Sequence, residues 1–364
     1  MKIAIIGSRG IPNRYGGFEQ LAEELSLGLL QKGHSVTVYN SDRHQYRKNS
    51  FKGVDIVHCY DAEHLLGTAG QFIYDLNCIR DARKKGFEVL LFLGYTSSSV
   101  WRRLFPSKSV IIFNMDGLEW KRSKYSGLVR AFLKYAEKLA VRFSDHLVAD
   151  SPLIRDYLIK KYGVESRYIP YGAFIPAGIK KGLLKEFNCT AKNYYMLMGR
   201  MEPENNIATI LEGFHRSRSE QKFIVLGNTN NSYGRYLVKR FGTDVRICFA
   251  GAIYDKEINH ALRSYCSLYF HGHSVGGTNP SLLEAMADGA MIAAHDNEFN
   301  RSVLGEDAHY FSSPDGVNKI IDTFKDDPLM TAHNLDKINT RYNWPAVIDQ
   351  YNELFTTCHK STRK

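Results

Sequence analysis

Two stretches decide the fold: GSRGIPNRYGGFE at residues 7–19 and HGHSVGGTNPSLLEAM at residues 271–286. Each follows an apolar run typical of a strand, contains a glycine-rich loop, and leads into a run with helical periodicity. Loops of this kind direct backbone N–H groups and the N-terminus of a helix towards one point, where an anion is stabilised. The chain therefore carries two predicted anion-binding half-sites, one near each end.

Length and composition narrow the class of protein. The 364 residues exceed what one hydrophobic core usually serves, so we expect two domains. Hydrophobic residues at 44% and charged residues at 24% are typical of a soluble protein, and no apolar run approaches the roughly 18 residues of a membrane-spanning helix. The six cysteines have no CxxC spacing, which favours buried thiols in a reducing compartment. We expect a cytoplasmic protein.

Strand and helix patterns alternate in both halves of the chain. Apolar runs predict strands at 2–6, 35–39, 54–58, 88–93, 109–113 and 145–149, and again at 194–198, 222–226, 246–249, 268–270 and 291–294. These runs are apolar throughout, as expected for parallel strands that are buried on both faces. The Gly- and Pro-rich stretch 169–182 predicts a hinge, and residues 344–358 predict a last helix. The fold class predicted is α/β, with doubly wound parallel sheets.

The net charge of +10 is concentrated in residues 101–142, which hold ten basic and three acidic residues. Leu128, Phe132, Tyr135 and Leu139 recur there at three- and four-residue steps and predict a helix with one apolar stripe. Two interpretations remain open: a helix that packs on the core with a solvated basic face, or a surface that rests on an anionic membrane. No recognition-helix, zinc-finger or RNA-recognition pattern is present, so we expect no nucleic acid partner.

Four motifs together resemble the retaining GT-B glycosyltransferases of family four, and within them the bacterial rhamnosyltransferase-like branch. They are the two stretches above, NMDGLEWKR at 114–122 and GRMEPENN at 199–206. The resemblance implies two Rossmann-like doubly wound domains that face a central cleft. Residues 1–172 would bind the acceptor and residues 173–342 the nucleotide sugar, while residues 343–364 would form a helix that packs back toward the N-terminal domain.

Transfer from a nucleoside-diphosphate sugar needs donors and cations where the leaving diphosphate gains charge. The resemblance assigns that role to Arg200, and it implies that Glu284 accepts hydrogen bonds from the ribose. We expect the donor to be bound by Gly16, Gly17, Gly199, Arg200, Asn205, His273, Gly276, Gly277, Thr278, Asn279, Ser281 and Glu284. His271 is a further residue that could contact the sugar or diphosphate, or be structural.

Asp116 follows the predicted strand 109–113, and we expect it to position the acceptor hydroxyl or to take its proton. Asp116, Arg200 and Glu284 are the predicted catalytic residues. The predicted acceptor-binding residues are Arg14, Tyr15, Glu19, Asp116, Glu119, Trp120 and Lys121. No His, Asp or Cys cluster has metal-ligand spacing, so we predict transfer without a metal or cofactor, by attack on the same face of the sugar.

Two positions depart from the wider family pattern. Gly276 stands where a first glutamate is usual, and Asn205 stands where a lysine is usual. The missing carboxylate argues against a plain glucosyl- or mannosyltransferase and is compatible with a 6-deoxy sugar. We therefore predict transfer of L-rhamnose from dTDP-L-rhamnose onto a lipid-diphosphate-linked saccharide for a surface polysaccharide of the cell wall, capsule or O-antigen type, at the inner face of the cell membrane.

Other functions remain as alternatives. Another hexose could be transferred from a UDP- or GDP-sugar. An NAD-dependent oxidoreductase could use the first glycine-rich loop, but GSRGIP is not GxGxxG, and Asp42 lies 35 positions beyond Gly7 rather than about 20. A non-catalytic binder of anionic polymers or lipid would explain the charge but would leave two phosphate-type loops without a role.

Overall fold

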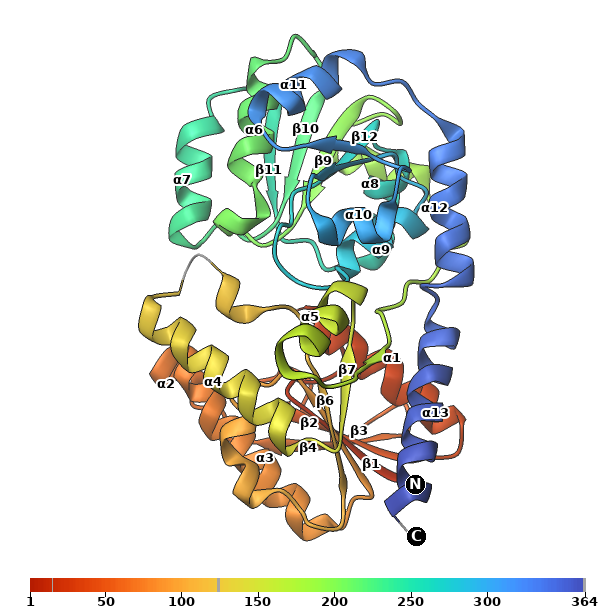
Figure 1. Ribbon diagram of the computed structural model, residues 1–364. Helices are drawn as coiled ribbons and strands as arrows, with labels where there is room; N and C mark the ends of the chain where they lie inside the picture. The colour runs from red at the N-terminus through yellow and green to blue at the C-terminus, as the bar shows by residue number, and fades with distance from the viewer. Residues whose placement is uncertain (15, 123–124, 363–364) are drawn as a thin grey trace. The chain divides into compact units, whose positions relative to one another are not determined.

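The structure is a computed structural model that describes residues 1–14, 16–122 and 125–362, so the predicted acceptor residue Tyr15 lies outside the described residues. The chain divides into two compact units (Figure 1). One is formed by Met1–Tyr171 together with Trp344–Lys364, and the other by Gly172–Asn343. The passage between Tyr171 and Gly172 lies in the Gly- and Pro-rich stretch of the sequence.

The N-terminal unit contains an eight-stranded sheet in the order β3-β4-β2-β1-β5-β6-β7-β8. Its strands are β1 (Lys2–Ile6), β2 (Ser35–Ser41), β3 (Ser50–Phe51), β4 (Val54–Cys59), β5 (Val89–Leu93), β6 (Val110–Asn114), β7 (His146–Ala149) and β8 (Arg167–Tyr168). All neighbours pair in parallel except β3 with β4. The strand order reverses between β1 and β5, which makes the sheet doubly wound.

Helices cover both faces of this sheet (Figure 1). They are α1 (Gly17–Gln31), α2 (Glu63–Leu66), α3 (Gly70–Lys85), α4 (Gly127–Phe143), α5 (Pro152–Tyr162) and α13 (Trp344–Thr362), with 3-10 turns η1 (Gly67–Ala69), η2 (Ser99–Leu104) and η3 (Glu119–Lys121). The last helix, α13, packs on α1, where Gly28 leaves room for Ile348: a Cβ at Gly28 would lie 2.4 Å from the Ile348 Cδ1 atom. The C-terminal segment thus belongs to the core of the N-terminal unit.

The C-terminal unit contains a six-stranded parallel sheet in the order β11-β10-β9-β12-β13-β14. Its strands are β9 (Tyr194–Met198), β10 (Lys222–Leu226), β11 (Ile247–Gly251), β12 (Leu268–His271), β13 (Ile292–His295) and β14 (His309–Phe311). Its helices are α6 (Ile207–Arg216), α7 (Ser232–Phe241), α8 (Lys256–Tyr265), α9 (Pro280–Ala287), α10 (Glu298–Leu304), α11 (Pro314–Thr323) and α12 (Pro328–Thr340), with 3-10 turns η4 (Lys181–Phe187) and η5 (Pro203–Asn205). The strand order reverses between β9 and β12, so this sheet is doubly wound as well.

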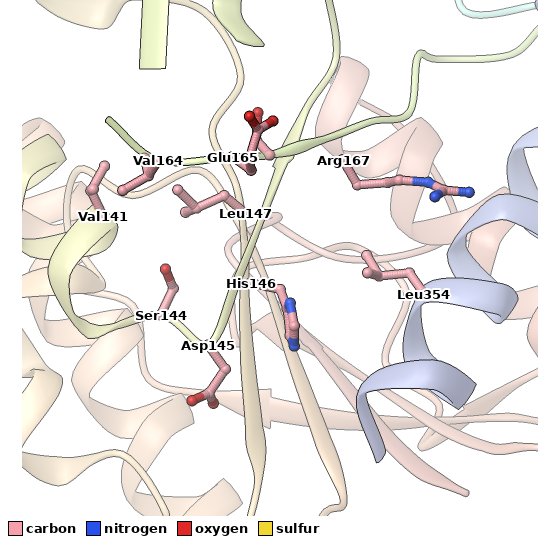
Figure 2. A pocket seen from close by; sticks show the side chains of 10 residues that line it. Val141, Ser144, Asp145, His146, Leu147, Val164, Glu165, Arg167 and Leu354 are labelled. Carbon is pink, nitrogen blue, oxygen red and sulfur yellow. The ribbon is translucent and has the colours of Figure 1, made fainter. Parts of the chain in front are cut away.

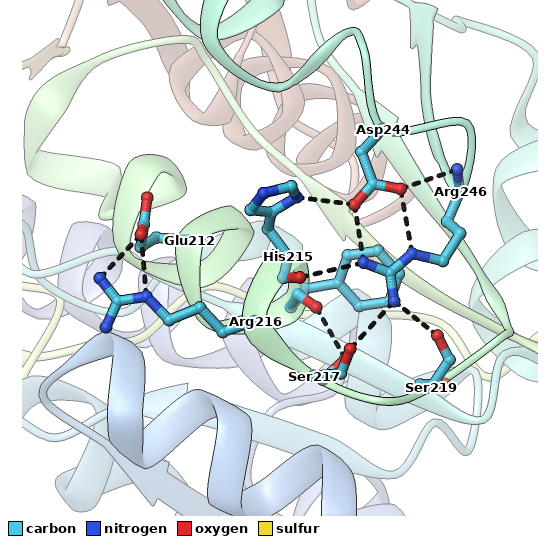
Figure 3. A network of polar contacts seen from close by, with 8 residues as sticks. Glu212, His215, Arg216, Ser217, Ser219, Asp244 and Arg246 are labelled. Carbon is cyan, nitrogen blue, oxygen red and sulfur yellow. Dashed lines mark hydrogen bonds and ion pairs between the residues drawn. The ribbon is translucent and has the colours of Figure 1, made fainter.

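A polar network holds the start of β11 to the end of α6 (Figure 3). Arg246 donates from Nε and Nη2 to the Asp244 carboxylate, at 3.0 and 2.7 Å, and from Nη1 to the carbonyl oxygens of Ser217 and Ser219, at 3.1 and 2.6 Å. The Arg246 hydrogen bonds hold the pKa of Asp244 well below its usual range, and a contact with His215 adds to the effect. This cluster stabilises the unit and lies apart from the residues predicted to bind the donor.

Most of the apolar stripe predicted for the basic helix lies outside the core. The helix forms as α4, but of its four predicted stripe residues only Leu139 is buried, while Leu128 is 87% exposed. The buried face of α4 consists of Leu133, Ala136, Glu137, Leu139 and Ala140. Residues three and four positions apart are neighbours on the surface of a helix, so the sequence of α4 contains two adjacent apolar stripes. The stripe with the smaller side chains is the one that packs on the core.

Candidate active site

In the C-terminal unit, the loop after β12 is fastened to the loop after β9. Asn206 donates from Nδ2 to the Gly272 carbonyl oxygen at 2.8 Å, and Ser274 donates from its backbone N and its hydroxyl to the Glu204 carbonyl oxygen, at 3.1 and 2.8 Å. Gly272 permits this approach, because a Cβ there would lie 2.0 Å from the Asn205 carbonyl oxygen. The two loops form one surface at the carboxyl edge of the sheet, where doubly wound sheets bind ligands.

Several residues predicted to bind the donor converge at the end of β9. A Cβ at Gly199 would lie 3.3 Å from the His273 Cε1 atom and 3.7 Å from the Asn205 Nδ2 atom. Asn205 is buried and donates from Nδ2 to the Arg200 carbonyl oxygen at 2.7 Å, so its side chain shapes the loop that carries Arg200. The Arg200 side chain is 55% exposed and lies 3.9 Å from the Glu202 carboxylate, which leaves its guanidinium accessible to an anion.

The glycine-rich loop presents backbone N–H groups. Gly276 has a φ of +126°, which L side chains rarely adopt. Within the described part of the chain, the N–H groups of Gly276 and Gly277 have no hydrogen-bond acceptor. Helix α9 starts at Pro280, and its N-cap Asn279 accepts from the backbone N and the hydroxyl of Ser281, at 3.0 and 2.8 Å. The loop and the helix N-terminus together supply the donors and dipole that stabilise an anion.

His271 is a buried polar group at the end of β12. Its side chain is in contact with solvent over only 1% of its surface, and neither ring nitrogen has a hydrogen-bond partner among the described residues. Burial lowers the pKa of His271 well below its ordinary value, and the neighbouring His273 and His295 lower it further. The rings of His271 and His273 are stacked at 4.5 Å. A neutral imidazole buried without a partner is unfavourable, so this position calls for a ligand group.

Glu284 lies on α9, one turn after the helix begins at Pro280, and its side chain is 29% exposed. Its Oε2 atom lies 3.1 Å from Nη1 of the buried Arg263. The same Nη1 donates to the Met198 sulfur at 3.6 Å, which connects Glu284 to the end of β9, two residues before Arg200. Thr278, another predicted donor residue, is buried. Arg200 and Glu284 thus belong to the same edge of this unit.

In the N-terminal unit, the loop after β1 is held by acidic side chains of α1. The buried Glu19 accepts a hydrogen bond from the Arg9 backbone N at 2.7 Å, so this predicted acceptor residue has a role in shaping the loop. Gly16 is the N-cap of α1, and its carbonyl oxygen accepts from the Gln20 backbone N at 3.1 Å. Gly17 is the first residue of the helix. These glycines lie where the loop turns into α1.

A pocket of about 370 Å³ lies where the loops after β1, β2 and β4 meet. The residues that line it are charged or polar and include Arg9, Arg14, Glu19, Arg43 and Asp61. The exposed Arg14, a predicted acceptor residue, donates to the Gln45 side chain across this pocket. The pocket is therefore the place in this unit where predicted acceptor residues line a cavity.

The NMDGLEWKR segment follows β6. Asp116 is half-buried with a φ of +32°, and its backbone N donates to the Asn114 Oδ1 atom at 3.1 Å. Asn114 in turn donates to the Tyr351 hydroxyl of α13 at 3.0 Å. The Glu119 carboxylate is occupied by the Arg122 guanidinium, at 2.9 and 2.7 Å, while the predicted acceptor residue Lys121 is exposed. A strained backbone at Asp116 is typical of functional positions.

Trp120 is fixed by Glu137, a residue that the sequence analysis did not single out. The indole Nε1 donates to the Glu137 carboxylate at 3.0 Å, and the Lys134 ammonium lies 4.6 Å from the ring centre. Glu137 is fully buried and accepts further hydrogen bonds from Tyr95, Tyr157, Lys161 and Tyr162. Its only sequence signal is a single acidic residue within a basic helix, which does not reveal these partners.

A second pocket, of about 410 Å³, lies at the amino end of β7 (Figure 2). It is lined by Asp145, His146, Arg167 and Leu354, among others. Asp145 accepts from the Ile111 backbone N at 2.8 Å, and Arg167 pairs with Glu353 at 2.7 Å, so both of these charged groups have structural partners. It lies at the edge of the sheet opposite the loops above, and no predicted site residue lines it.

Within residues 1–14, 16–122 and 125–362, no three or more His, Cys, Asp or Glu side chains gather closely enough to hold a metal ion. None of the helices in the same part of the chain combines the length and apolar character of a membrane-spanning segment.

Comparison with known families assigns the two halves separately. Residues 1–174 match a domain of unknown function, DUF1972, and residues 185–341 match the family model described as glycosyl transferases group 1. A search of curated protein sequences returned no match.

Comparison with solved structures identifies the fold. The chain is similar to sucrose-phosphate synthase from Thermosynechococcus elongatus, with a TM-score of 0.81, 16% identity and coverage of 99% of both chains. It is also similar to Anabaena HepE in complex with UDP and glucose, with a TM-score of 0.73, 15% identity and coverage of 98% of this chain and 100% of the other. The catalytic domain of starch synthase IV from Arabidopsis thaliana, bound to ADP and acarbose, gives a TM-score of 0.72 at 11% identity over 99% of both chains.

The group 1 model favours sugar transfer over the nicotinamide-dependent oxidoreductase that the first loop left open. The chain is a glycosyltransferase with the GT-B fold of two Rossmann-like domains, and its residues 185–341 form a glycosyl transferases group 1 domain.

Proposed function

We propose that the chain transfers L-rhamnose, with retention, from dTDP-L-rhamnose to a lipid-diphosphate-linked saccharide. The observation that carries the donor half of this proposal is the surface formed by the loops after β9 and β12. It combines an accessible guanidinium at Arg200, the N–H groups of Gly276 and Gly277, and the N-terminus of α9. Such a set of donors matches the charge that develops on a leaving diphosphate.

The proposed roles follow from this arrangement. Arg200 and the loop N–H groups hold the diphosphate, and the partly exposed carboxylate of Glu284 accepts a hydrogen bond from the deoxyribose. His271 and His273 lie beside the sugar, and the buried His271 supplies the ring nitrogens of a neutral imidazole. No metal takes part in the proposed transfer, because the cation and the loop donors neutralise the leaving group.

The choice of sugar rests on Gly276. Glycine offers no carboxylate to bind a sugar hydroxyl, and L-rhamnose lacks the 6-hydroxyl group of the common hexoses. A UDP-hexose donor is the second candidate, since HepE, which shares this fold, was solved in complex with UDP-glucose.

The acceptor half of the proposal places the saccharide on the N-terminal unit. Arg14 and Glu19 line its pocket between the loops after β1, β2 and β4, and Asp116 positions the acceptor hydroxyl or receives its proton. The acceptor attacks the same face of the sugar that the diphosphate leaves, and the departing phosphate oxygen assists deprotonation. Trp120 and Lys121 contact the saccharide from the adjacent turn.

The lipid-linked acceptor requires contact with the inner surface of the cell membrane, and α4 supplies it in this proposal. Its outward row of Leu128, Phe132 and Tyr135 is exposed, and Lys134 and Lys138 are exposed between these residues. Apolar side chains interleaved with cations suit an anionic membrane surface. Flotation with anionic liposomes tests this: Leu128→Glu should lose binding, whereas Val245→Glu, at an equally exposed residue of the other unit, should retain it. Equal flotation of both variants would refute the contact.

The transfer itself is tested with purified protein and a prenyl-diphosphate-linked saccharide. The donors dTDP-L-rhamnose, UDP-glucose, UDP-galactose and GDP-mannose are offered separately, and mass spectrometry of the lipid fraction detects the added sugar. We expect addition of a deoxyhexose from dTDP-L-rhamnose, and its loss in Glu284→Ala. Addition of a hexose from one of the other donors would support the second candidate, and no transfer from any donor would refute the assigned reaction.

A further inference from the structure

Arg263 is a buried cation that connects Glu284 on α9 with Asp288, the C-cap of that helix. It lies on α8, and only 2% of its side chain is exposed. Its Nε donates to the Asp288 carboxylate, and its Nη1 lies 3.1 Å from the Glu284 carboxylate. Glu284 and Asp288 are four residues apart, so both carboxylates project from the same face of the helix. One guanidinium therefore holds both side chains.

The Asp288 end of this cluster is the anchor. The Asp288 side chain has no exposed surface, and its second oxygen lies 2.6 Å from the His260 Nδ1 atom. Burial alone would lower the pKa of Arg263, but the Glu284 and Asp288 carboxylates raise it above its ordinary value. The guanidinium is thus charged and fixed on its inner side by the wholly buried carboxylate of Asp288.

The Glu284 end is different, because this carboxylate is partly exposed at the ligand edge of the sheet. A free glutamate side chain would sample several rotamers and would lose that freedom when a ligand binds. A carboxylate that is bonded to a buried, fixed cation loses this rotamer freedom when the protein folds, so ligand binding no longer carries the cost. Burying a charged arginine is unfavourable in itself, so a role at the site offers a reason for its presence.

We propose that Arg263 is a positioning residue that fixes the Glu284 carboxylate for the 3′-hydroxyl on the deoxyribose of the donor nucleotide. This inference rests on the proposed function of Glu284 and adds the residue through which the carboxylate is oriented. Arg263 acts behind Glu284 and does not touch the nucleotide. Its effect should therefore depend on whether the ligand carries the hydroxyl that Glu284 binds.

The test compares two ligands, dTDP and its 3′-deoxy analogue, by calorimetric titration of the full chain. Hydrogen bonds to charged groups predict that the wild type binds dTDP at least about tenfold more tightly than the analogue. Arg263→Lys keeps the positive charge but loses the guanidinium nitrogens that contact both carboxylates. In this variant we expect the ratio of the affinities for dTDP and its analogue to fall towards one. Affinity for the analogue should stay within about twofold of the wild type.

Two further variants keep the test decisive. Asp288→Asn removes the anchor and should lower the same ratio, which covers the case in which Arg263→Lys does not fold. Arg246→Lys is the matched control, because Arg246 is also a largely buried arginine bonded to an aspartate, in the cluster of Figure 3. It should weaken the folded state but leave the ligand ratio unchanged. Circular dichroism confirms the fold of each variant.

The possible results distinguish a failure of the role assigned to Arg263 from a failure of the proposed function on which that role rests. An equal loss of affinity for both ligands in Arg263→Lys and Asp288→Asn would show a merely structural role and overturn the proposal. A wild type that binds both ligands equally would overturn it too, while leaving nucleotide binding intact. A wild type that binds neither dTDP nor UDP would refute the proposed function itself, and this inference with it.

Discussion

Replacing Arg200 with alanine should separate catalysis from stability. The Arg200 side chain is 55% exposed, and its contact with Glu202 is long, at 3.9 Å. Exposed ion pairs contribute about 0–1 kcal/mol, so the free energy of unfolding should change by less than about 1 kcal/mol. The guanidinium is assigned to the charge that grows on the leaving diphosphate, where the loss of one donor lowers kcat by about 10²- to 10³-fold.

Arg216→Ala is the matched control for this variant. Arg216 lies in the same unit and is 51% exposed, so it resembles Arg200 in exposure, although its ion pairs with Glu212 and Asp315, at 2.7 and 3.2 Å, are shorter. Urea unfolding measures the stability of both variants, and release of nucleoside diphosphate measures their activity. We expect near-wild-type activity in Arg216→Ala and a loss of at least about 100-fold in Arg200→Ala. An Arg200→Ala enzyme as active as the control would refute the assignment.

Three further variants test other parts of the account. His271→Phe removes a buried imidazole without a partner, so the melting temperature should stay equal or rise while donor affinity falls about tenfold; a lower melting temperature with unchanged donor affinity would contradict this. Glu137→Gln should lower the free energy of unfolding, measured in urea, by about 2–3 kcal/mol. Because Glu137 fixes Trp120, the same variant should raise KM for the acceptor rather than for the donor. An unchanged acceptor KM would count against Trp120 as an acceptor contact. The folded-state pKa of Asp244 is depressed, so its stabilisation is fully present above the unfolded value of 3.8 and is lost as the pH falls through the folded value. The stability difference between the wild type and Asp244→Asn should therefore be greatest near neutral pH and shrink below pH 3.8, and a difference independent of pH in denaturant titrations would contradict the assigned pair.

The strands were predictable because they are buried and apolar. The predicted strands at 2–6, 194–198 and 222–226 have the same bounds as β1, β9 and β10. The structure also contains β3, β8 and β14, which the sequence did not predict. These edge strands have two or three residues, too few to show a hydrophobic period, and their pairing depends on a neighbour elsewhere in the chain.

The sequence predicted where the loops of the site lie, but not which side chains contact one another there. The glycine-rich stretch 271–286 indicates a turn between a strand and a helix, and β12 and α9 confirm it. The partners of Arg263 and Glu137 are different in kind, because they come from separate elements and have no fixed spacing. Arg263 meets Glu284 and Asp288 across two helices, which no periodicity in one segment can reveal.

Hydrogen–deuterium exchange with and without dTDP-L-rhamnose tests the central claim most directly, because it locates the bound donor on the backbone. The account predicts slower exchange in residues 272–283 and 199–206, which carry the loop N–H groups and Arg200, and no change at the β7 pocket around His146. Protection confined to that pocket, or no protection anywhere with this donor or with UDP-glucose, would contradict it.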